Sequence, residues 1–164
     1  MKPLIEIMLE VVVRDKNGRI IARRRKRAGY LNNFVRAIRC NDFYLAETLR
    51  DLGGTNRSLS AGSSFQTPTI RVGSGSTAQT PGDYKLETEL GTTGASVGAV
   101  VVVGQNSQFT ISGSVTLSAG GTVREVGVSC VCTYVFLFFR DVVPEVPVPT
   151  GGTCTVVYTL IFTA

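Results

Sequence analysis

The chain has 164 residues, with 17 Lys/Arg against 12 Asp/Glu, and it contains no histidine. Without histidine, a Ser–His–Asp or Cys–His catalytic site and a zinc site of mixed Cys/His composition are excluded. The 18 glycines and the low charged fraction of 18%, together with many Ser, Thr and Val residues, predict a mainly β fold with many turns. We therefore expect a structural protein rather than an enzyme, with no cofactor and no metal.

The positive charge is concentrated at the N-terminal end. Residues 1–50 contain twelve Lys/Arg and five Asp/Glu, whereas residues 51–164 contain five and seven. Such charge blocks often mark an interaction face. We predict a basic arm over residues 1–52, made of a β-hairpin and a helix, and a β-sandwich body over residues 53–164, together forming one compact domain.

Residues 4–27 have the pattern of a β-hairpin. Apolar residues alternate from Ile5 to Val13, which is the period-two pattern of a strand with one buried face. Asn17-Gly18 is a hairpin turn signal, and a return strand is expected from Arg19 to Arg27. The first strand is expected to pair within its own sheet, with pairing to a neighbouring subunit as the alternative.

The return strand ends in an uninterrupted basic run, for which three interpretations stay open. The run can bind nucleic-acid phosphates, dock on an acidic protein surface during assembly, or act as a solvated edge that blocks unwanted strand pairing. No aromatic residue interrupts it, which argues against base stacking. Its members are Arg23, Arg24, Arg25, Lys26 and Arg27.

Helical spacing follows the hairpin. Apolar residues between Tyr30 and Ile38 recur at three- and four-residue intervals and predict a helix near residues 29–40. Leu45, Leu49 and Leu52 extend a weaker pattern, which predicts a short second helix near residues 42–51 that ends at Gly53-Gly54. A loop is expected over residues 53–66.

The rest of the chain carries strand and turn signals. Residues 69–75 are expected to form a short strand ending in a Gly-rich turn, and the span from Pro144 to Pro149 an extended edge or crossing segment. Glu87 and Glu89, with Asp83 nearby, are interpreted as a solvated strand face rather than a glycosidase-like carboxylate pair. Further strands are expected at residues 97–103, 107–117, 122–140 with one break, and 153–163, which favours an antiparallel, jelly-roll-like β-sandwich.

The cysteines are mainly expected to be buried thiols. Cys130 and Cys132 share one face of a strand, so they are not expected to bond to each other. Either can form a disulfide with Cys154 if the C-terminal strand lies alongside, and more readily if the source is a thermophile.

One apolar cluster is a candidate interface. Phe136 and Phe138 lie in a run of four apolar residues that alternates poorly. If the run is not buried on both sides within the subunit, we expect these two residues to contact a partner.

Membrane insertion is not expected. The longest apolar run, from Val126 to Phe139, is interrupted by small and polar residues and is shorter than a membrane-spanning helix. A carboxylate at Glu6 lies where a secretory signal would be apolar, so synthesis in the cytoplasm is expected.

Six turn and strand segments share a further pattern: residues 30–34, 72–78, 81–86, 125–128, 139–142 and 146–153. Together these segments resemble structural proteins of tailed phages and archaeal viruses. The resemblance covers most of the chain, and the cysteines and the long basic run depart from the pattern. It implies a virion component of the capsid, decoration, fibre or tail type, made in the host cytoplasm, whose partners are further copies of itself and other virion proteins. A filament subunit joined by strand exchange and a small nucleic-acid-binding β-domain are the alternatives.

Overall fold

The computed structural model describes residues 5–163, which are mainly β: 59% lie in strands, and these residues contain one helix. Residues 1–4 and 164, which the predicted arm and body include, lie outside the described part. The elements in chain order are β1 (Ile5–Arg14), β2 (Ile20–Arg27), α1 (Asn32–Asp42), β3 (Glu47–Arg50), β4 (Asn56–Leu59), β5 (Gln66–Gly73), β6 (Glu89–Gly94), β7 (Ser96–Val97), β8 (Val101–Val103), β9 (Asn106–Leu117), β10 (Gly121–Val131), β11 (Val135–Val148) and β12 (Gly152–Thr163).

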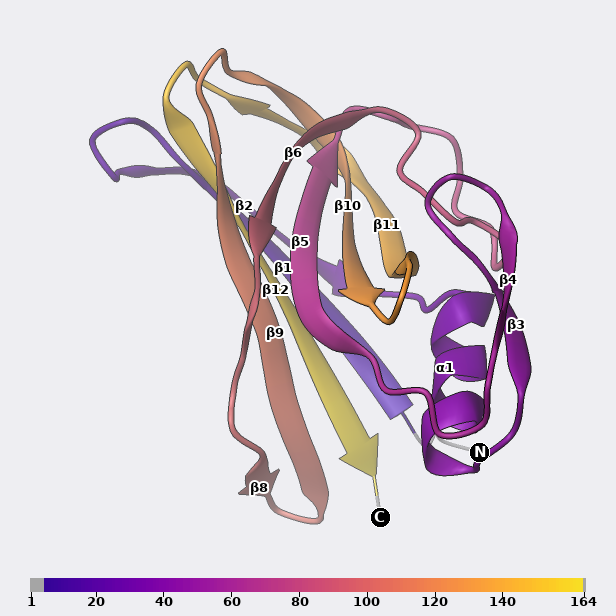
Figure 1. Cartoon of the computed structure of the whole chain (residues 1–164). Coiled ribbons are helices and arrows are strands. Elements are labelled where there is room, and N and C mark those ends of the chain that lie inside the picture. Colours follow the sequence, from indigo (N-terminus) through magenta and orange to yellow (C-terminus); the bar gives the residue numbers. More distant parts are fainter. Residues whose placement is uncertain (1–4, 164) are drawn as a thin grey trace.

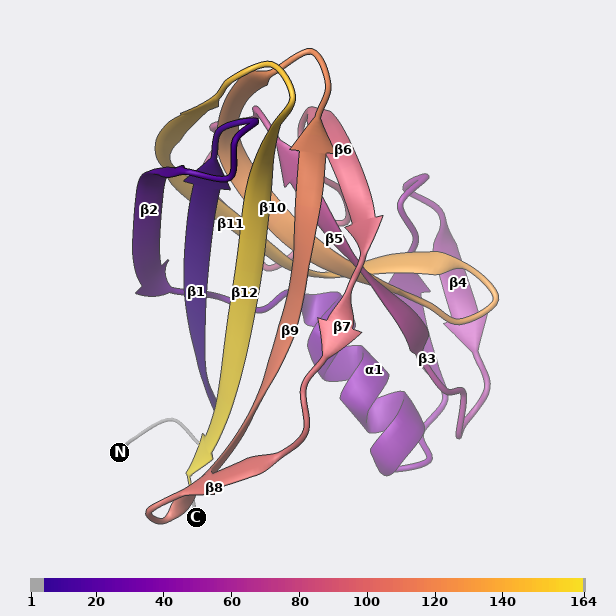
Figure 2. The same cartoon turned by 90° about the vertical axis from the view of Figure 1, so that its left-hand side faces the viewer.

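Two antiparallel sheets face each other in a sandwich-like arrangement (Figures 1 and 2). The six-stranded sheet has the order β2-β1-β12-β9-β7, with β8 paired to β9. The four-stranded sheet has the order β11-β10-β5-β6. The helix α1 and the small β3-β4 ribbon lie beside the four-stranded sheet (Figure 2). The predicted mainly β, antiparallel class is confirmed.

One hydrophobic core fills the space between the sheets. Alternate residues of each long strand point inward, as the period-two pattern predicts. Each large apolar side chain removed from water stabilises the fold by roughly 1.5–3 kcal/mol. The most buried members include Leu9, Val11, Val13, Ile70, Val126, Val128, Phe136, Phe139, Val156, Tyr158 and Leu160.

The N-terminal strand is an interior strand of the six-stranded sheet. β1 pairs antiparallel with β2 on one side and with β12 on the other, with Leu9 opposite Tyr158. β1 therefore pairs within its own sheet, as expected, and not with a strand of a neighbouring subunit. Its buried face is apolar because Leu9, Val11 and Val13 enter the core, while Glu6 and Glu10 stay on the outer face.

The helix is confirmed, but the segment after it was predicted wrongly. α1 ends at Asp42, and the expected second helix and loop contain the strands β3 and β4, which pair with each other. The leucine spacing fits a helix by coincidence, because the burial of Leu49 comes from packing beside α1. Gly54, at φ +85°, forms the tight turn of this ribbon rather than a helix stop.

The remaining strands follow the predicted turns closely. β9, β10 and β12 occupy the predicted spans, and the predicted break after β10 falls at residues 132–134. β11 starts as predicted but runs on to Val148, past the predicted end of the strand at residue 140. The predicted strand 97–103 is divided into the short strands β7 and β8. β11 carries Pro144 and Pro147 and is an edge strand, where a missing N–H is tolerated.

Candidate interaction surface

The basic run forms most of β2, which is an edge strand of the six-stranded sheet. Its side chains alternate between the two faces of the sheet. On the outer face, Arg25 Nε lies 2.6 Å from Glu10 Oε1, and Arg23 Nε lies 3.3 Å from the same oxygen. Arg27 Nη2 lies 2.7 Å from Glu6 Oε1. Two glutamates of β1 therefore face three arginines of β2, which leaves an excess of positive charge.

Lys26 points to the inner side instead. Its Nζ lies 3.5 Å from Asp141 Oδ1 and donates a hydrogen bond of 3.0 Å to the carbonyl of Val142 on β11. This side chain thus links the edge of the six-stranded sheet to the four-stranded sheet. It belongs to the fold and is not free to contact a partner.

Asp141 is fully buried beside Lys26. Its carboxylate accepts hydrogen bonds from the Tyr158 hydroxyl at 3.1 Å and from the Gly29 N–H at 3.2 Å. Burial raises the pKa of Asp141, although these donors and Lys26 favour the charged form. Burial and the neighbouring Asp141 also raise the pKa of Tyr158.

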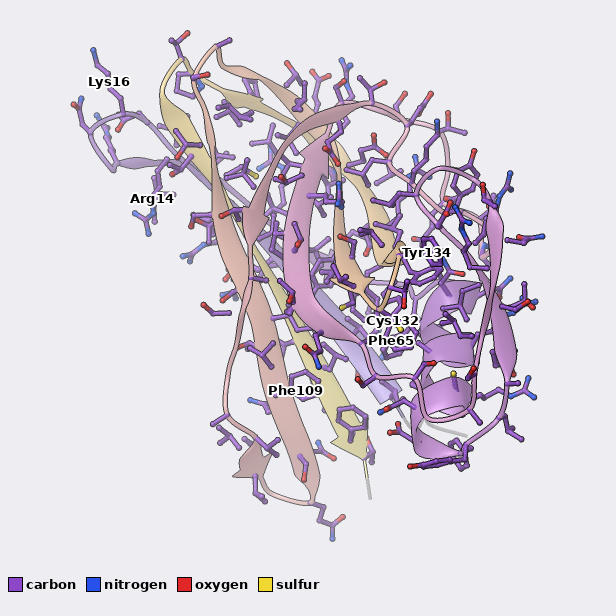
Figure 3. All side chains as sticks on the ribbon, in the orientation of Figure 1. Arg14, Lys16, Phe65, Phe109, Cys132 and Tyr134 are labelled. Carbon is purple, nitrogen blue, oxygen red and sulfur yellow. The ribbon has the colours of Figure 1, made fainter. Side chains whose placement is uncertain are left out.

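Arg24 faces the inner side at the open margin of the sheet and is exposed. Within residues 5–163 it makes no ion pair, and its guanidinium donates only to the carbonyl of Arg23. The neighbouring β1–β2 turn adds Arg14 and Lys16, which project away from the body (Figure 3). The basic surface therefore consists of Arg23, Arg24, Arg25 and Arg27 together with this turn.

The other half of the same sheet carries no charge. No charged residue occurs from Gly91 to Val123 or from Gly151 to Ala164, spans that include β7, β8, β9 and β12. The outer face of β9 and β12 is lined mainly by Ser and Thr, with Val157 and Ile161 among them, and 2.7 Å separates the Ser114 and Thr155 hydroxyls. One sheet thus presents a basic margin and an uncharged margin.

Phe136 and Phe138 do not form an exposed interface. Their exposed fractions are 0% and 7%, and both belong to the central core. Phe65 packs against both rings, and Phe34 also packs against Phe138. These two side chains are therefore not exposed to a partner, because Phe65 and the helix residue Phe34 cover them.

The cysteines form no disulfide: all four lie in the described residues and are free thiols. Cys154 lies on β12, whose neighbours are β1 and β9, whereas Cys130 lies on β10 in the other sheet, with Cys132 just after it. The C-terminal strand therefore does not lie alongside β10, as the disulfide requires. Burial raises the pKa of Cys130 and of Cys154 to about 12, which keeps these thiols protonated.

A buried ion pair that the sequence did not reveal fixes the Gly-rich segment after β5. Glu125, fully buried, accepts hydrogen bonds from the N–H groups of Gly75, Glu87 and Thr88 at 2.9–3.1 Å. Its other partner is Arg140, whose Nε donates to Glu125 Oε2 at 2.9 Å. The predicted Gly-rich turn is therefore held around one carboxylate.

Arg140 extends this network towards the surface. Its Nη1 donates to Asp83 Oδ2 at 2.7 Å, and its Nη2 donates to the carbonyl of Thr77 at 3.1 Å. Burial raises the pKa of Asp83, but hydrogen bonds from Thr80 and Arg140 outweigh this and lower it overall. Glu87 accepts the N–H groups of Ser76 and Thr77, and hydrogen bonds from Thr77 and Ser76 lower its pKa.

The prediction of a solvated strand face fits Glu89, which lies on β6, is exposed and pairs with Arg71. It is wrong for Asp83, which is partly buried and binds Arg140. Glu87 is exposed as predicted, but it lies in the loop before β6 and binds the N–H groups of that loop. A shallow cavity of about 350 Å³ adjoins Asp83, and the Arg50 guanidinium at its wall lies 3.9 Å from the centre of the Tyr84 ring. The network orders a long loop.

Comparisons with protein-family models, with curated proteins and with solved structures find no match. Among the described residues, no helix has the length and apolar character needed to cross a membrane.

Proposed function

We propose that this chain is a virion structural protein that assembles or stabilises a viral particle through contacts with copies of itself and with capsid or tail proteins. The observation that carries the proposal is the division of one sheet into a basic margin at β2 and an uncharged margin at β7, β8 and β9. Two margins of different chemistry on one sheet suit a subunit with two kinds of neighbour.

The internal construction supports this role. The loop after β5 is held by Glu125 and Arg140, and Lys26 links the two sheets. A subunit whose long loops and sheet edges are fastened in this way presents fixed surfaces, which lowers the entropic cost of assembly.

We further propose a jelly-roll-like topology within the sandwich. In support, β9 pairs with β12 in one sheet, while the intervening β10 and β11 pair with each other in the opposite sheet. This nested pairing is the one expected when a long antiparallel ribbon rolls over itself.

The basic margin is proposed to face an acidic surface of another virion protein. Glu6 and Glu10 already neutralise part of its charge, and the residual charge is spread along one short strand. Charge complementarity of this kind orients a partner more than it adds affinity. A location in the virion follows from this proposal.

Two alternatives are ranked lower. In a filament joined through β1, that strand would have to leave its own sheet, where both of its edges are occupied by β2 and β12. In a nucleic-acid-binding domain, the arginines of β2 would have to exchange Glu6 and Glu10 for phosphates.

The test combines electron microscopy with nucleic-acid retention. Images of the purified chain in high salt are expected to contain ordered assemblies, and weak retention on duplex DNA is expected at physiological salt. Dispersed single subunits together with strong retention that falls steeply as salt rises would overturn the proposal in favour of nucleic-acid binding.

A further inference from the structure

The strand β8 forms a free, apolar margin of the six-stranded sheet. Within the described residues it pairs only with β9, and it lies at one end of the molecule beyond the four-stranded sheet (Figures 1 and 2). Val100, Val101, Val102 and Val103 have exposed fractions between 53% and 71%. Four consecutive exposed valines beside an unpaired strand edge are unusual on the surface of an isolated subunit.

The main chain of β8 has hydrogen-bonding groups available at this edge. Val103 lies opposite Asn106 across the two-residue turn Gly104-Gln105, with Gly104 at φ +63°. The pair flanking such a turn is hydrogen-bonded, and bonded and non-bonded pairs alternate along an antiparallel ladder. Val102 and Ser107 are therefore a non-bonded pair, so the N–H and C=O of Val102 point away from β9.

Edge strands elsewhere in the two sheets carry charges or prolines. β2 carries four arginines, β11 carries Pro144 and Pro147, and β6 begins with Glu89. The exception is β7 (Ser96–Val97), which lies beside β8 on the same side of β9. Charges and prolines on edge strands are the usual protection against pairing with another chain. β7 and β8 have neither, so this margin lacks the usual protection against pairing with another chain.

The uncharged residues around β8 favour a second copy of this chain as its binding partner. The span from Gly91 to Val123 has no charged residue, so two copies of this margin meet without like-charge repulsion. A two-fold axis would place identical apolar side chains against each other, as in most dimers. An acidic or basic partner would find no opposite charge here.

We propose that two copies of this chain join through β8, antiparallel to each other, with a two-fold axis at Val102 that makes one continuous sheet. The proposal deepens the proposed assembly function and rests on it. A stable interface covers about 800 Å² on each partner, more than the valines alone provide. The contact would therefore also include the neighbouring edge strand β7, whose Val97 is 55% exposed and which lies on the same side of β9 as β8.

Sedimentation velocity of Val102→Pro tests the geometry. Proline removes the outward N–H of Val102, which β9 does not use, so the subunit is expected to keep its melting temperature. At the two-fold axis two hydrogen bonds are lost, and the dissociation constant is expected to rise on the order of a hundredfold. Val102→Thr keeps the N–H and the branched shape, and is expected to associate like the parent.

A second pair of variants shows whether a loss of association comes from the β8 interface or from a general loss of folding. Val102→Asp places two like charges at the axis and is expected to dissociate the dimer, whereas Phe43→Asp, at a residue that is 67% exposed elsewhere, is expected to leave it intact. If the parent associates and both Val102→Pro and Val102→Asp associate equally well, the β8 interface is wrong but the proposed assembly function still stands. A parent that is monomeric at every concentration overturns the proposed function as well.

Discussion

Arg140 donates a hydrogen bond from Nε to Glu125 Oε2 over 2.9 Å, and the two residues are only 3% and 0% exposed. Glu125 lies on β10 and Arg140 on β11, and together they reach the loop between β5 and β6. Burying two charges is costly unless each is paired and further hydrogen-bonded. Here both conditions hold, so this pair couples the loop to the four-stranded sheet.

Glu125→Ala is expected to lower the free energy of unfolding by about 3–5 kcal/mol, because it leaves the Arg140 charge buried without this partner. Chemical denaturation of the purified variant measures the loss. Glu145→Ala is the matched control, since Glu145 pairs with Arg124 at 2.9 Å but both side chains are exposed. The control is expected to cost less than about 1 kcal/mol, and equal losses for both variants would contradict the account.

Gly73→Ala is expected to destabilise the chain by about 1–3 kcal/mol. A methyl group at Gly73 would lie 2.5 Å from the carbonyl oxygen of Thr88 and 2.6 Å from Glu125 Oε1. Gly82→Ala is the control, because no atom lies within 4 Å of its added carbon. Thermal melting of both variants is the measurement, and an unchanged melting temperature for Gly73→Ala would show that the loop adapts freely.

Lys26→Met is expected to cost about 1–3 kcal/mol, because Asp141 is left buried without its cation. Arg24→Met removes one charge from the same strand at a site without a carboxylate partner among the described residues, and it is expected to change stability by less than about 0.5 kcal/mol. Denaturant titration at neutral pH compares the two. Equal effects would mean that Lys26 belongs to the basic surface rather than to the core.

Asp141→Asn is expected to change how stability depends on pH. Burial raises the pKa of Asp141, so the folded parent binds more protons than the unfolded chain above the ordinary value of about 4. The parent therefore loses stability as pH rises from about 4 to the raised pKa, and the variant lacks this loss. The stability of the parent minus that of the variant should fall over this range, and a rise would contradict the assignment.

The parts of the fold that depend on local pattern were predictable. The alternation in β9 and β12 and the Gly and Pro turns determined the strands of the body, because each strand buries one face. The ribbon of β3 and β4 was missed because Leu45, Leu49 and Leu52 also fit helical spacing, and only packing beside α1 decides between the two.

The important polar contacts were not predictable from spacing. Glu125 binds N–H groups that lie 37 to 50 residues away, and Arg140 reaches Asp83 across 57 residues. A lone glutamate in an apolar strand is the one signal that was present, since a charge there needs a partner. The basic run was located correctly on β2, but the inward position of Lys26 depends on the edge of the sandwich, which only the assembled sheets define.

The molar mass of the purified chain in high salt, measured by light scattering over a range of protein concentrations, tests the central claim most directly. High salt screens the arginines of β2 but not the uncharged margin at β8. The account predicts a mass of at least twice the 17.5 kDa subunit. A mass of one subunit at every concentration would contradict it.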